Sequence, residues 1–397
     1  MRRRAEQLYE SPNALAAHYS AFRVSERLLL TGHSHQAWPD RAEVGHVRAF
    51  RDAAEHVDRK WELAEARAER VREGFARLLD AAPSTICLGA STHDLLVRWL
   101  SALPLAARPC IVTTTAEFHS ARRQLARLSE AGLRVIWVPA YPAATVGERL
   151  AAAVDDRVAA AVVSTVFYDS GEVAGALDAV ARACDVHGAA LLLDAYHQLN
   201  VVPFSVGAHG FENAFVTGGG YKYCQLGEGN CFLRSPPDTT LRPIVTGWFA
   251  DFAGLEATSA SGVGFGPLTV RFAGATYDPV SHYRASEVFD FFDEMDLTAD
   301  FLREVSQHQV GVLRDAVDAL DAPAAVLSRS DVPLGALGGF LALRSPQASA
   351  LVRELARRGV HADARGDVLR LGPAPYLSDA QLRDAVLALG EAVRQVT

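Results

Sequence analysis

Residues 188–197 read Gly188-Ala189-Ala190-Leu191-Leu192-Leu193-Asp194-Ala195-Tyr196-His197, and this stretch decides the fold. Its apolar residues run without polar alternation, which is typical of a strand buried on both faces of a parallel sheet. The run ends on the carboxylate of Asp194, which is costly to bury unless it is paired. We therefore expect the end of a buried strand here, with Asp194 either serving a bound ligand or capping a following helix.

On both sides of this strand the sequence alternates short apolar runs with helical patterns. Helical patterns at Asp94–Leu103, Ala121–Ala131 and Leu177–His187 separate some of the short apolar runs. These runs lie at Thr85–Leu88, Cys110–Thr113, Val135–Val138, Val158–Val163, Ala189–Leu193, Ala214–Val216 and Cys231–Leu233. The alternation predicts an α/β fold with a mostly parallel central sheet flanked by helices. In such sheets ligands bind beyond the carboxyl ends of the strands.

The flanking regions have other patterns. Residues 40–80 are charged and alanine-rich with apolar residues at helical spacing, which predicts one or two long helices. After Pro279 we expect a long helical region, Arg284–Leu320, and then strand Gly339–Leu343, helix Ala348–Arg358, strand Val368–Leu371 and helix Asp379–Val396. We therefore predict three parts: residues 1–60, an N-terminal segment packing on the small domain; 61–283, a large α/β domain; and 284–397, a smaller α+β domain.

Composition excludes several classes of function. The 397 residues carry a net charge of −8, whereas a basic domain is expected of a nucleic-acid-binding protein. Met1-Arg2-Arg3-Arg4 is basic, but no apolar segment follows it, so we expect no signal peptide, and no apolar run is long enough for a membrane span. No cluster at metal-ligand spacing occurs, so no metal is expected. Scattered, unpaired cysteines favour a reduced, cytoplasmic protein: Cys87, Cys110, Cys184, Cys224 and Cys231.

A lysine follows a glycine-rich stretch in Gly218-Gly219-Gly220-Tyr221-Lys222-Tyr223. Glycine lets a ligand approach the backbone closely. The amine of Lys222 can form an imine with an aldehyde, and burial lowers a lysine pKa so that the neutral nucleophile is available. The alternative is a surface lysine in a turn, because lysine is mostly exposed.

Further segments carry candidate ligand contacts, each with a structural alternative. Ser91 and Thr92 stand where a strand gives way to a helix, a position suited to phosphate binding or to plain capping. Phe118 is expected either to lie against a flat cofactor ring or to pack in the core. His197 is placed to stack near such a ring or to hydrogen-bond the strand-end aspartate. Arg370, inside an apolar strand, suits the α-carboxylate of an amino acid or a structural salt bridge.

The order of these parts is more specific than any one of them. A phosphate loop, an aromatic residue, Asp194, Lys222 28 residues later and an arginine in the C-terminal domain are the parts of a fold-type I enzyme that uses pyridoxal 5'-phosphate (PLP). Lys222 would carry PLP as a Schiff base. Asp194 would keep the pyridine nitrogen protonated, so that the ring acts as an electron sink.

Over residues 30–376 the protein resembles kynureninase, within the class V aminotransferase group. Asp194-Ala195-Tyr196-His197 resembles the family's Asp-x-x-His, and Gly220-Tyr221-Lys222-Tyr223 resembles its Tyr-Lys-Tyr. Four further segments resemble family motifs: Val163-Ser164-Thr165-Val166, Gly247-Trp248-Phe249, Arg271-Phe272-Ala273-Gly274-Ala275-Thr276 and Val368-Leu369-Arg370-Leu371-Gly372-Pro373-Ala374-Pro375-Tyr376. The resemblance implies a fold-type I PLP-dependent transferase architecture.

The resemblance also implies roles for particular residues. Ser164 would lie near the cofactor, and Arg370 would grip the carboxylate of a small amino-acid substrate. The family forms a homodimer with shared active sites, so Trp248, at the PLP phosphate, and Thr276 would serve the partner's site. Tyr221 would act as an acid or as an orienting group.

The departures from the family fall on the substrate side. Phe118-His119-Ser120-Ala121 stands where the family has Phe-Pro-Ser-Asp, and Gly247-Trp248-Phe249-Ala250-Asp251 replaces Gly-Trp-Trp-Gly-His. Gly32-His33-Ser34-His35-Gln36 replaces Gly-Asn-Ser-Leu-Gly. We expect His35 and Asp251 to contact substrate together with Arg370. An anion at residue 251 favours a neutral or positive substrate side chain, provided that it faces the pocket.

The expected function is a kynureninase-like cleavage of a C–C bond in the substrate's side chain, through an external aldimine and a quinonoid, with Lys222 as general base. A C–S lyase or desulfurase ranks lower, because desulfurases use a cysteine in the C-terminal half and all five cysteines precede residue 232. A class V aminotransferase or biosynthetic enzyme stays open. A non-catalytic protein of this fold would not need Asp194, Lys222 and Arg370 together. A nucleotide loop at Gly262-Val263-Gly264-Phe265-Gly266 lacks a strand–helix context.

Overall fold

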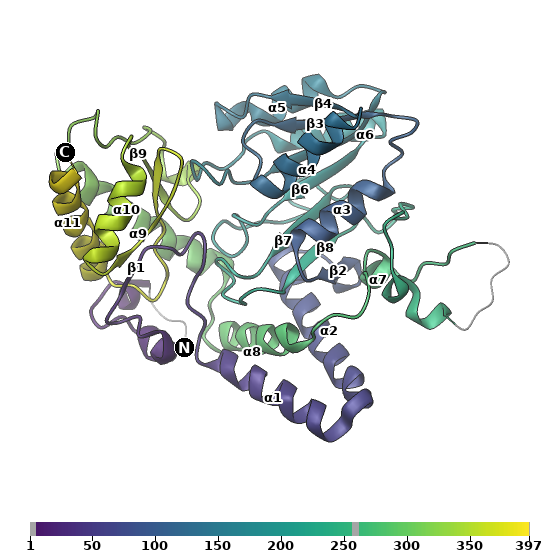
Figure 1. Cartoon of the computed structure of the whole chain (residues 1–397), viewed down its shortest axis with the longest axis horizontal. Coiled ribbons are helices and arrows are strands. Elements are labelled where there is room, and N and C mark those ends of the chain that lie inside the picture. The colour runs from purple at the N-terminus through teal and green to yellow at the C-terminus, as the bar shows by residue number, and fades with distance from the viewer. Residues whose placement is uncertain (1–4, 256–261, 397) are drawn as a thin grey trace.

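A seven-stranded sheet forms the centre of the larger part of the molecule (Figure 1). The computed structural model describes residues 5–255 and 262–396, so the basic residues 1–4 lie outside it. In these ranges the strand order is β2-β8-β7-β6-β5-β3-β4, and β8 runs antiparallel to both neighbours while the other pairs are parallel. The strands are β2 (Ile86–Gly89), β3 (Cys110–Thr114), β4 (Arg134–Val138), β5 (Val158–Ser164), β6 (Ala190–Asp194), β7 (Phe215–Gly219) and β8 (Cys231–Arg234). All seven predicted strands are confirmed, with ends shifted by a few residues.

Helices cover both faces of this sheet, which is why its strands have apolar residues on both sides. Along β6, Leu192 joins a core formed with α3 and α4, whereas Leu191 and Leu193 join the core formed with α5 and α6. The bounds are α3 (Thr92–Ala102), α4 (His119–Glu130), α5 (Val146–Ala153) and α6 (Leu177–His187). The predicted α/β layering with a mostly parallel sheet is therefore confirmed.

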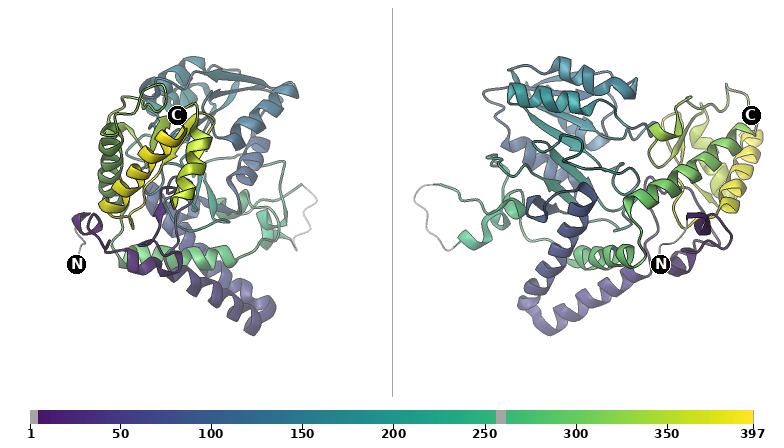
Figure 2. Two further views of the ribbon diagram at one scale, coloured as in Figure 1. Left: turned by 60° about the vertical axis from the view of Figure 1, so that its left-hand side comes forward. Right: turned by 180° about the vertical axis from the view of Figure 1, so that it is seen from behind.

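A second, smaller sheet lies toward the C-terminus. Its order is β11-β12-β9, all antiparallel, and helices α9, α10 and α11 lie beside it (Figure 2). The bounds are α9 (Ala299–Asp318), β9 (Leu341–Arg344), α10 (Ala348–Arg357), β11 (Asp363–Arg365), β12 (Val368–Leu371) and α11 (Asp379–Val396). The helical region expected over residues 284–320 is two helices, because α8 (Val280–Glu294) ends before Asp296, whose φ of 52° is left-handed.

The N-terminal residues are divided between two neighbours. β1 (Leu28–Leu29) pairs in parallel with β10 (Val360–His361), and Tyr9 stacks on His308 of α9 at 3.6 Å. In contrast, α1 (Arg41–His56) lies against α8, below the large sheet in Figure 1. The segment before residue 40 therefore contacts β10 and α9 of the C-terminal part. The three-part division at residues 60 and 283 stays a prediction.

The remaining helices are short, apart from α2. None of the helices in the described ranges combines the length and the apolar character that crossing a membrane requires. Their bounds are η1 (Ala5–Leu8), η2 (Ala16–Phe22), η3 (Val57–Arg59), α2 (Lys60–Leu79), η4 (Pro83–Thr85), η5 (Ala143–Thr145), η6 (Trp248–Gly254), α7 (Leu268–Arg271) and η7 (Leu334–Ala336).

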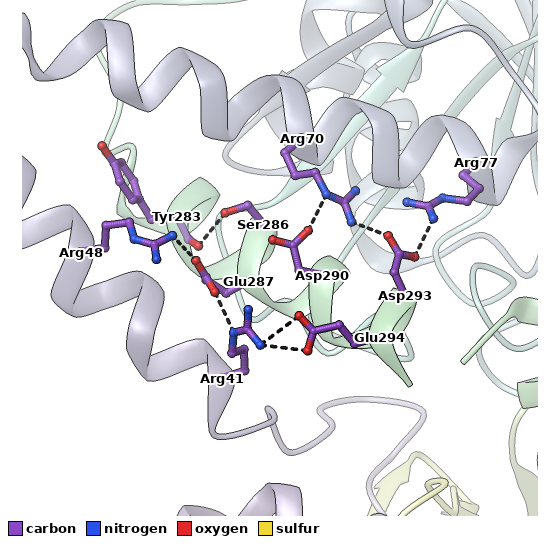
Figure 3. A network of polar contacts seen from close by, with 10 residues as sticks. All are labelled: Arg41, Arg48, Arg70, Arg77, Tyr283, Ser286, Glu287, Asp290, Asp293 and Glu294. Carbon is purple, nitrogen blue, oxygen red and sulfur yellow. Dashed lines mark hydrogen bonds and ion pairs between the residues drawn. The ribbon is translucent and has the colours of Figure 1, made fainter. Parts of the chain in front are cut away.

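Acidic residues of α8 are tied to arginines of α1 and α2 (Figure 3). The side chain of Glu287 is 3% exposed and accepts hydrogen bonds from Arg41 Nε at 2.9 Å and from Arg48. Arg70 of α2 bridges Asp290 and Asp293, each at 2.7 Å. A buried carboxylate requires such partners, so this network fixes α8 between the two N-terminal helices.

Candidate active site

A cavity of about 370 Å³ opens at the carboxyl ends of the parallel strands, where ligands of such sheets bind. Ser164 ends β5 and Asp194 ends β6, and the two are partners in the sheet register. Eight of the predicted site residues line this cavity: Ser91, Thr92, Phe118, Ser164, Asp194, His197, Tyr221 and Lys222. Ser120, Ala121, Tyr168, Tyr196 and Glu228 line it as well.

Lys222 is buried at the cavity, so it is not a surface lysine in a turn. Its residue exposure is 5%, and its Nζ lies 2.6 Å from His197 Nε2 and 4.6 Å from the centre of the Tyr196 ring. Burial lowers the pKa of Lys222 to about 7, although the charge of Asp194 opposes this shift. A substantial fraction of the amine is therefore neutral and nucleophilic at neutral pH.

Asp194 follows the buried strand and is not a helix cap, because the residues after it form turns. Its Oδ1 accepts a hydrogen bond from the backbone N–H of Tyr196 at 3.0 Å. Burial raises the pKa of Asp194, against this hydrogen bond and the charge of Lys222. A cationic group in the cavity would favour the ionised form of this carboxyl and lower its pKa again.

His197 and Phe118 both face the cavity near the lysine. Burial lowers the pKa of His197 well below its usual range, so the ring is neutral. Its Nδ1 is buried and has no hydrogen-bond partner among the described residues. The Phe118 ring centre lies 5.3 Å from Lys222 Nζ, and its edge meets Tyr168. Phe118 is thus a wall of the cavity and not simply a core residue.

The start of α3 also borders the cavity. Ser91 Oγ accepts from the backbone N–H of Asp94 at 3.1 Å and donates to the Asp94 carboxylate at 2.9 Å. Ser91 is therefore the N-cap of α3, which is the capping role given above as the alternative to phosphate binding. Both Ser91 and Thr92 line the cavity, so phosphate binding at this helix start stays a prediction.

Glu117 is a buried acid that sequence reasoning did not select. It is 1% exposed, and its Oε2 accepts from Ser164 N at 3.0 Å and Ser164 Oγ at 2.7 Å, while Oε1 accepts from Thr114 Oγ1 at 2.6 Å. Burial raises the pKa of Glu117 to about 7, against these hydrogen bonds, and the charge of Asp194 adds to the shift. It follows the β3 strand, so the argument that selected Asp194 would have found it too.

Arg370 lies outside the residues that line the cavity and is held by a carboxylate. Its Nε and Nη2 donate to Asp363 at 2.9 and 2.5 Å, and its Nη1 donates to the backbone oxygen of Tyr168 at 2.7 Å. The structural salt bridge is thus present. A guanidinium has five N–H donors, so two remain, one on each terminal nitrogen, for a further carboxylate.

The other predicted site residues lie apart. His35 is at the rim, where its ring stacks on Tyr221 at 4.8 Å and its Nε2 lies 3.6 Å from Glu228. Trp248 and Asp251 lie on η6 and do not line the cavity of their own protomer. Thr276 lines a neighbouring cavity of about 590 Å³, which shares Glu228 with the first. A role for residues 248, 251 and 276 in a partner's site stays a prediction.

The sheet, the strand-end aspartate and the buried lysine are arranged as in the fold of the fold-type I PLP-dependent enzymes. Solved structures of this class share the fold. A structure of C-DES with glycine covalently linked to its PLP cofactor superposes with a TM-score of 0.81 at 14% identity, covering 94% of this chain and 98% of its own. The cysteine desulfurase CsdA from Escherichia coli has a TM-score of 0.79 at 17% identity, covering 97% and 99%. The predicted fold is confirmed.

Comparison of the sequence with known families and proteins gives a more specific similarity than the fold does. Residues 302–389 match the family described as the kynureninase C-terminal domain. A relative from Bacillus subtilis (strain 168), described as the uncharacterized aminotransferase YcbU, is 23% identical over 342 residues, which cover 86% of this chain and 88% of the relative. These matches confirm the predicted resemblance to kynureninase-like, class V PLP-dependent enzymes and support PLP as the cofactor.

Proposed function

We propose that this protein is a PLP-dependent enzyme that acts on an α-amino acid and cleaves a C–C bond in the substrate's side chain, in the manner of kynureninase. The observation that carries the proposal is the buried amine of Lys222, with its pKa lowered to about 7, in a cavity that also presents Asp194. The match of residues 302–389 to the kynureninase C-terminal domain supports the choice of reaction.

The residues of the cavity fit PLP. His197 Nδ1 is a buried atom without a partner among the described residues, and Asp194 lacks a cation beyond the lysine. In the proposed complex Lys222 would hold the aldehyde carbon and Asp194 the ring nitrogen. Phe118 and His197 would contact the ring, and the start of α3 would hold the phosphate. The family resemblance adds the partner's Trp248 and the partner's Thr276 in a homodimer.

Bound PLP supplies an electron sink for negative charge that develops at the substrate α-carbon. The protein's own groups supply binding and proton transfer. The amine of Lys222 would take the α-proton, because burial keeps it partly neutral. Tyr221 lies next to it, with its ring centre 5.7 Å from Nζ, and serves as acid or as orienting group. The two unused donors of Arg370 bind the substrate carboxylate.

A C–S lyase is the second candidate, because the solved structures with this fold include C-DES, described as a cystine C–S lyase, and cysteine desulfurases. All five cysteines of this protein are free and buried. A desulfurase mechanism that needs a mobile thiol is therefore less suited to this protein than direct C–S elimination. The name of the B. subtilis relative keeps an aminotransferase as a third candidate. The free cysteines also support a cytoplasmic location as part of the proposal.

The test is to incubate the purified holoenzyme with L-kynurenine, 3-hydroxykynurenine, L-cysteine, L-cystine and common amino acids. Visible spectra report which of them reacts, and product analysis separates alanine plus an aromatic acid from sulfide release and from transamination. Borohydride reduction followed by peptide mass spectrometry should place PLP on Lys222. Detection of PLP on another lysine, or of no bound PLP after reconstitution, would contradict the assignment of Lys222 as the PLP-binding residue. Sulfide release without C–C cleavage would favour the second candidate.

A further inference from the structure

A buried cluster beside the cavity joins the N-terminal loop to the C-terminal sheet. Asp363 on β11 lies directly opposite Arg370 on β12. Its two carboxylate oxygens accept the hydrogen bonds from Arg370 Nε and Nη2, and we call this bidentate pair the fork. His33 places its Nε2 2.8 Å from Oδ1 of the same carboxylate. We call His33, Asp363 and Arg370 the anchor cluster.

The protonation states in the anchor cluster follow from burial and charge. Burial lowers the pKa of His33 to about 4, against the hydrogen bond with Asp363, so the ring is neutral at neutral pH. Burial opposes ionisation of Asp363, but hydrogen bonds from His33 and Arg370 and the charge of Arg370 hold its pKa well below the usual range. A neutral imidazole has one N–H and a carboxylate only accepts. The N–H is therefore on Nε2 and donates to Asp363.

The His33 ring is held rigidly. It is 0% exposed and lies against Phe340 with a ring-centre distance of 4.7 Å. The backbone of Gly372 closes the other side, where a Cβ would lie 2.2 Å from Nδ1 of His33. A ring that cannot turn donates along one direction, so it fixes the plane of the Asp363 carboxylate.

Because the charges within the anchor cluster balance, binding of a substrate carboxylate depends on the orientation of the Arg370 guanidinium. Asp363 offsets the charge of Arg370, and neutral His33 adds none, so the anchor cluster itself has no net charge. Arg365 Nη2 also lies 3.6 Å from Asp363 Oδ2, but its side chain is 47% exposed and solvent screens its charge. A substrate carboxylate is therefore attracted mainly by well-directed hydrogen bonds from the two unused donors of Arg370, and such bidentate pairs depend strongly on geometry.

We infer that His33 is a positioning residue for the substrate α-carboxylate, acting through Asp363 to orient Arg370. The inference rests on the proposed function, in which Arg370 binds that carboxylate. A neutral imidazole acts here through its N–H, so the requirement is for a donor at the Nε2 position and not for a titrating group.

The experiment compares the holoenzyme with His33→Phe, which keeps a ring but has no donor, and with His33→Gln, whose amide nitrogen lies as far along the side chain as Nε2 and keeps a donor there. His308→Phe is the matched control, because His308 makes the same kind of contact, 2.8 Å from Asp379, away from the cavity. The probes are L-alanine, L-aspartate, L-cysteine and L-kynurenine and the α-carboxamide of each. Titration followed by visible absorbance gives each dissociation constant, and the readout is the ratio of carboxamide to carboxylate values.

We expect this ratio to fall about tenfold or more in His33→Phe, by the loss of one hydrogen bond to a charged group. It should stay within about threefold of wild type in His33→Gln and be unchanged in His308→Phe. If the phenylalanine variant does not fold, Asp363→Asn, which breaks the fork, should lower the same ratio. An unchanged ratio in folded His33→Phe, even with weaker binding of both probes, overturns the inference and leaves the proposed function standing. Failure of the wild type to respond to any amino acid overturns both.

Discussion

Replacing Glu117 with glutamine tests whether a neutral carboxyl lies beside the site. Burial raises the pKa of Glu117 from 4.5 to about 7. Between these pH values the folded protein binds more protons than the unfolded chain, so the Glu117 contribution to stability falls as pH rises through this window. One pKa unit corresponds to 1.36 kcal/mol, so the full change is about 3 kcal/mol.

Glutamine has nearly the same shape but does not titrate. Its amide oxygen can accept from both Ser164 donors, and its amide nitrogen can donate to Thr114 Oγ1, so we expect Glu117→Gln to fold. Its free energy of unfolding, relative to wild type, should rise by up to about 3 kcal/mol between pH 4.5 and 7 and then level off.

The assay is urea denaturation of both proteins at a series of pH values from 4.5 to 8, at fixed protein and PLP concentrations, because binding and association shift apparent stability. Glu26→Gln, at a carboxyl whose side chain is 68% exposed, is the control for the substitution itself. Parallel stability curves for wild type and Glu117→Gln across this window would refute the argument, since Glu117 would then be ionised in the folded protein at pH 5.

Three further substitutions test the site and the scaffold. Asp194→Ala should lower kcat by roughly 100-fold or more while PLP absorbance is retained, because the ring nitrogen loses its counter-charge; near-normal turnover in the folded variant would contradict this role. Arg370→Lys should reduce kcat/KM by about 10- to 100-fold, since a point charge cannot replace the bidentate fork, and an unchanged value would remove Arg370 from substrate binding. Glu287→Gln should lower the urea-measured free energy of unfolding by about 2–4 kcal/mol, because it breaks a buried ion-pair network. Glu294→Gln, at a side chain 56% exposed, should change it by less than about 1 kcal/mol, and equal effects would show that burial does not control this network.

The sequence by itself determined the architecture of the large sheet. A strand covered by helices on both faces must be apolar throughout, so runs such as residues 158–163 and 189–193 are recognisable without knowing their partners. A charged residue at the end of such a run stands out for the same reason. Asp194 could therefore be selected as a candidate by this rule, and Lys222 by the glycine-rich stretch before it, and both line the cavity. Glu117 follows the same rule, so it was accessible to sequence reasoning although it was not selected.

Only the tertiary structure decided what surrounds these groups. Whether Arg370 is free or paired depends on the register that sets Asp363 opposite it, and β11, only three residues long, carries too little pattern to be recognised. His33 reaches the same carboxylate from 330 residues away. The pKa values of Lys222 and Glu117 follow from burial, which many distant segments create together. Strand periodicity is a local property of the sequence, whereas desolvation and ion pairing arise from contacts that no local pattern records.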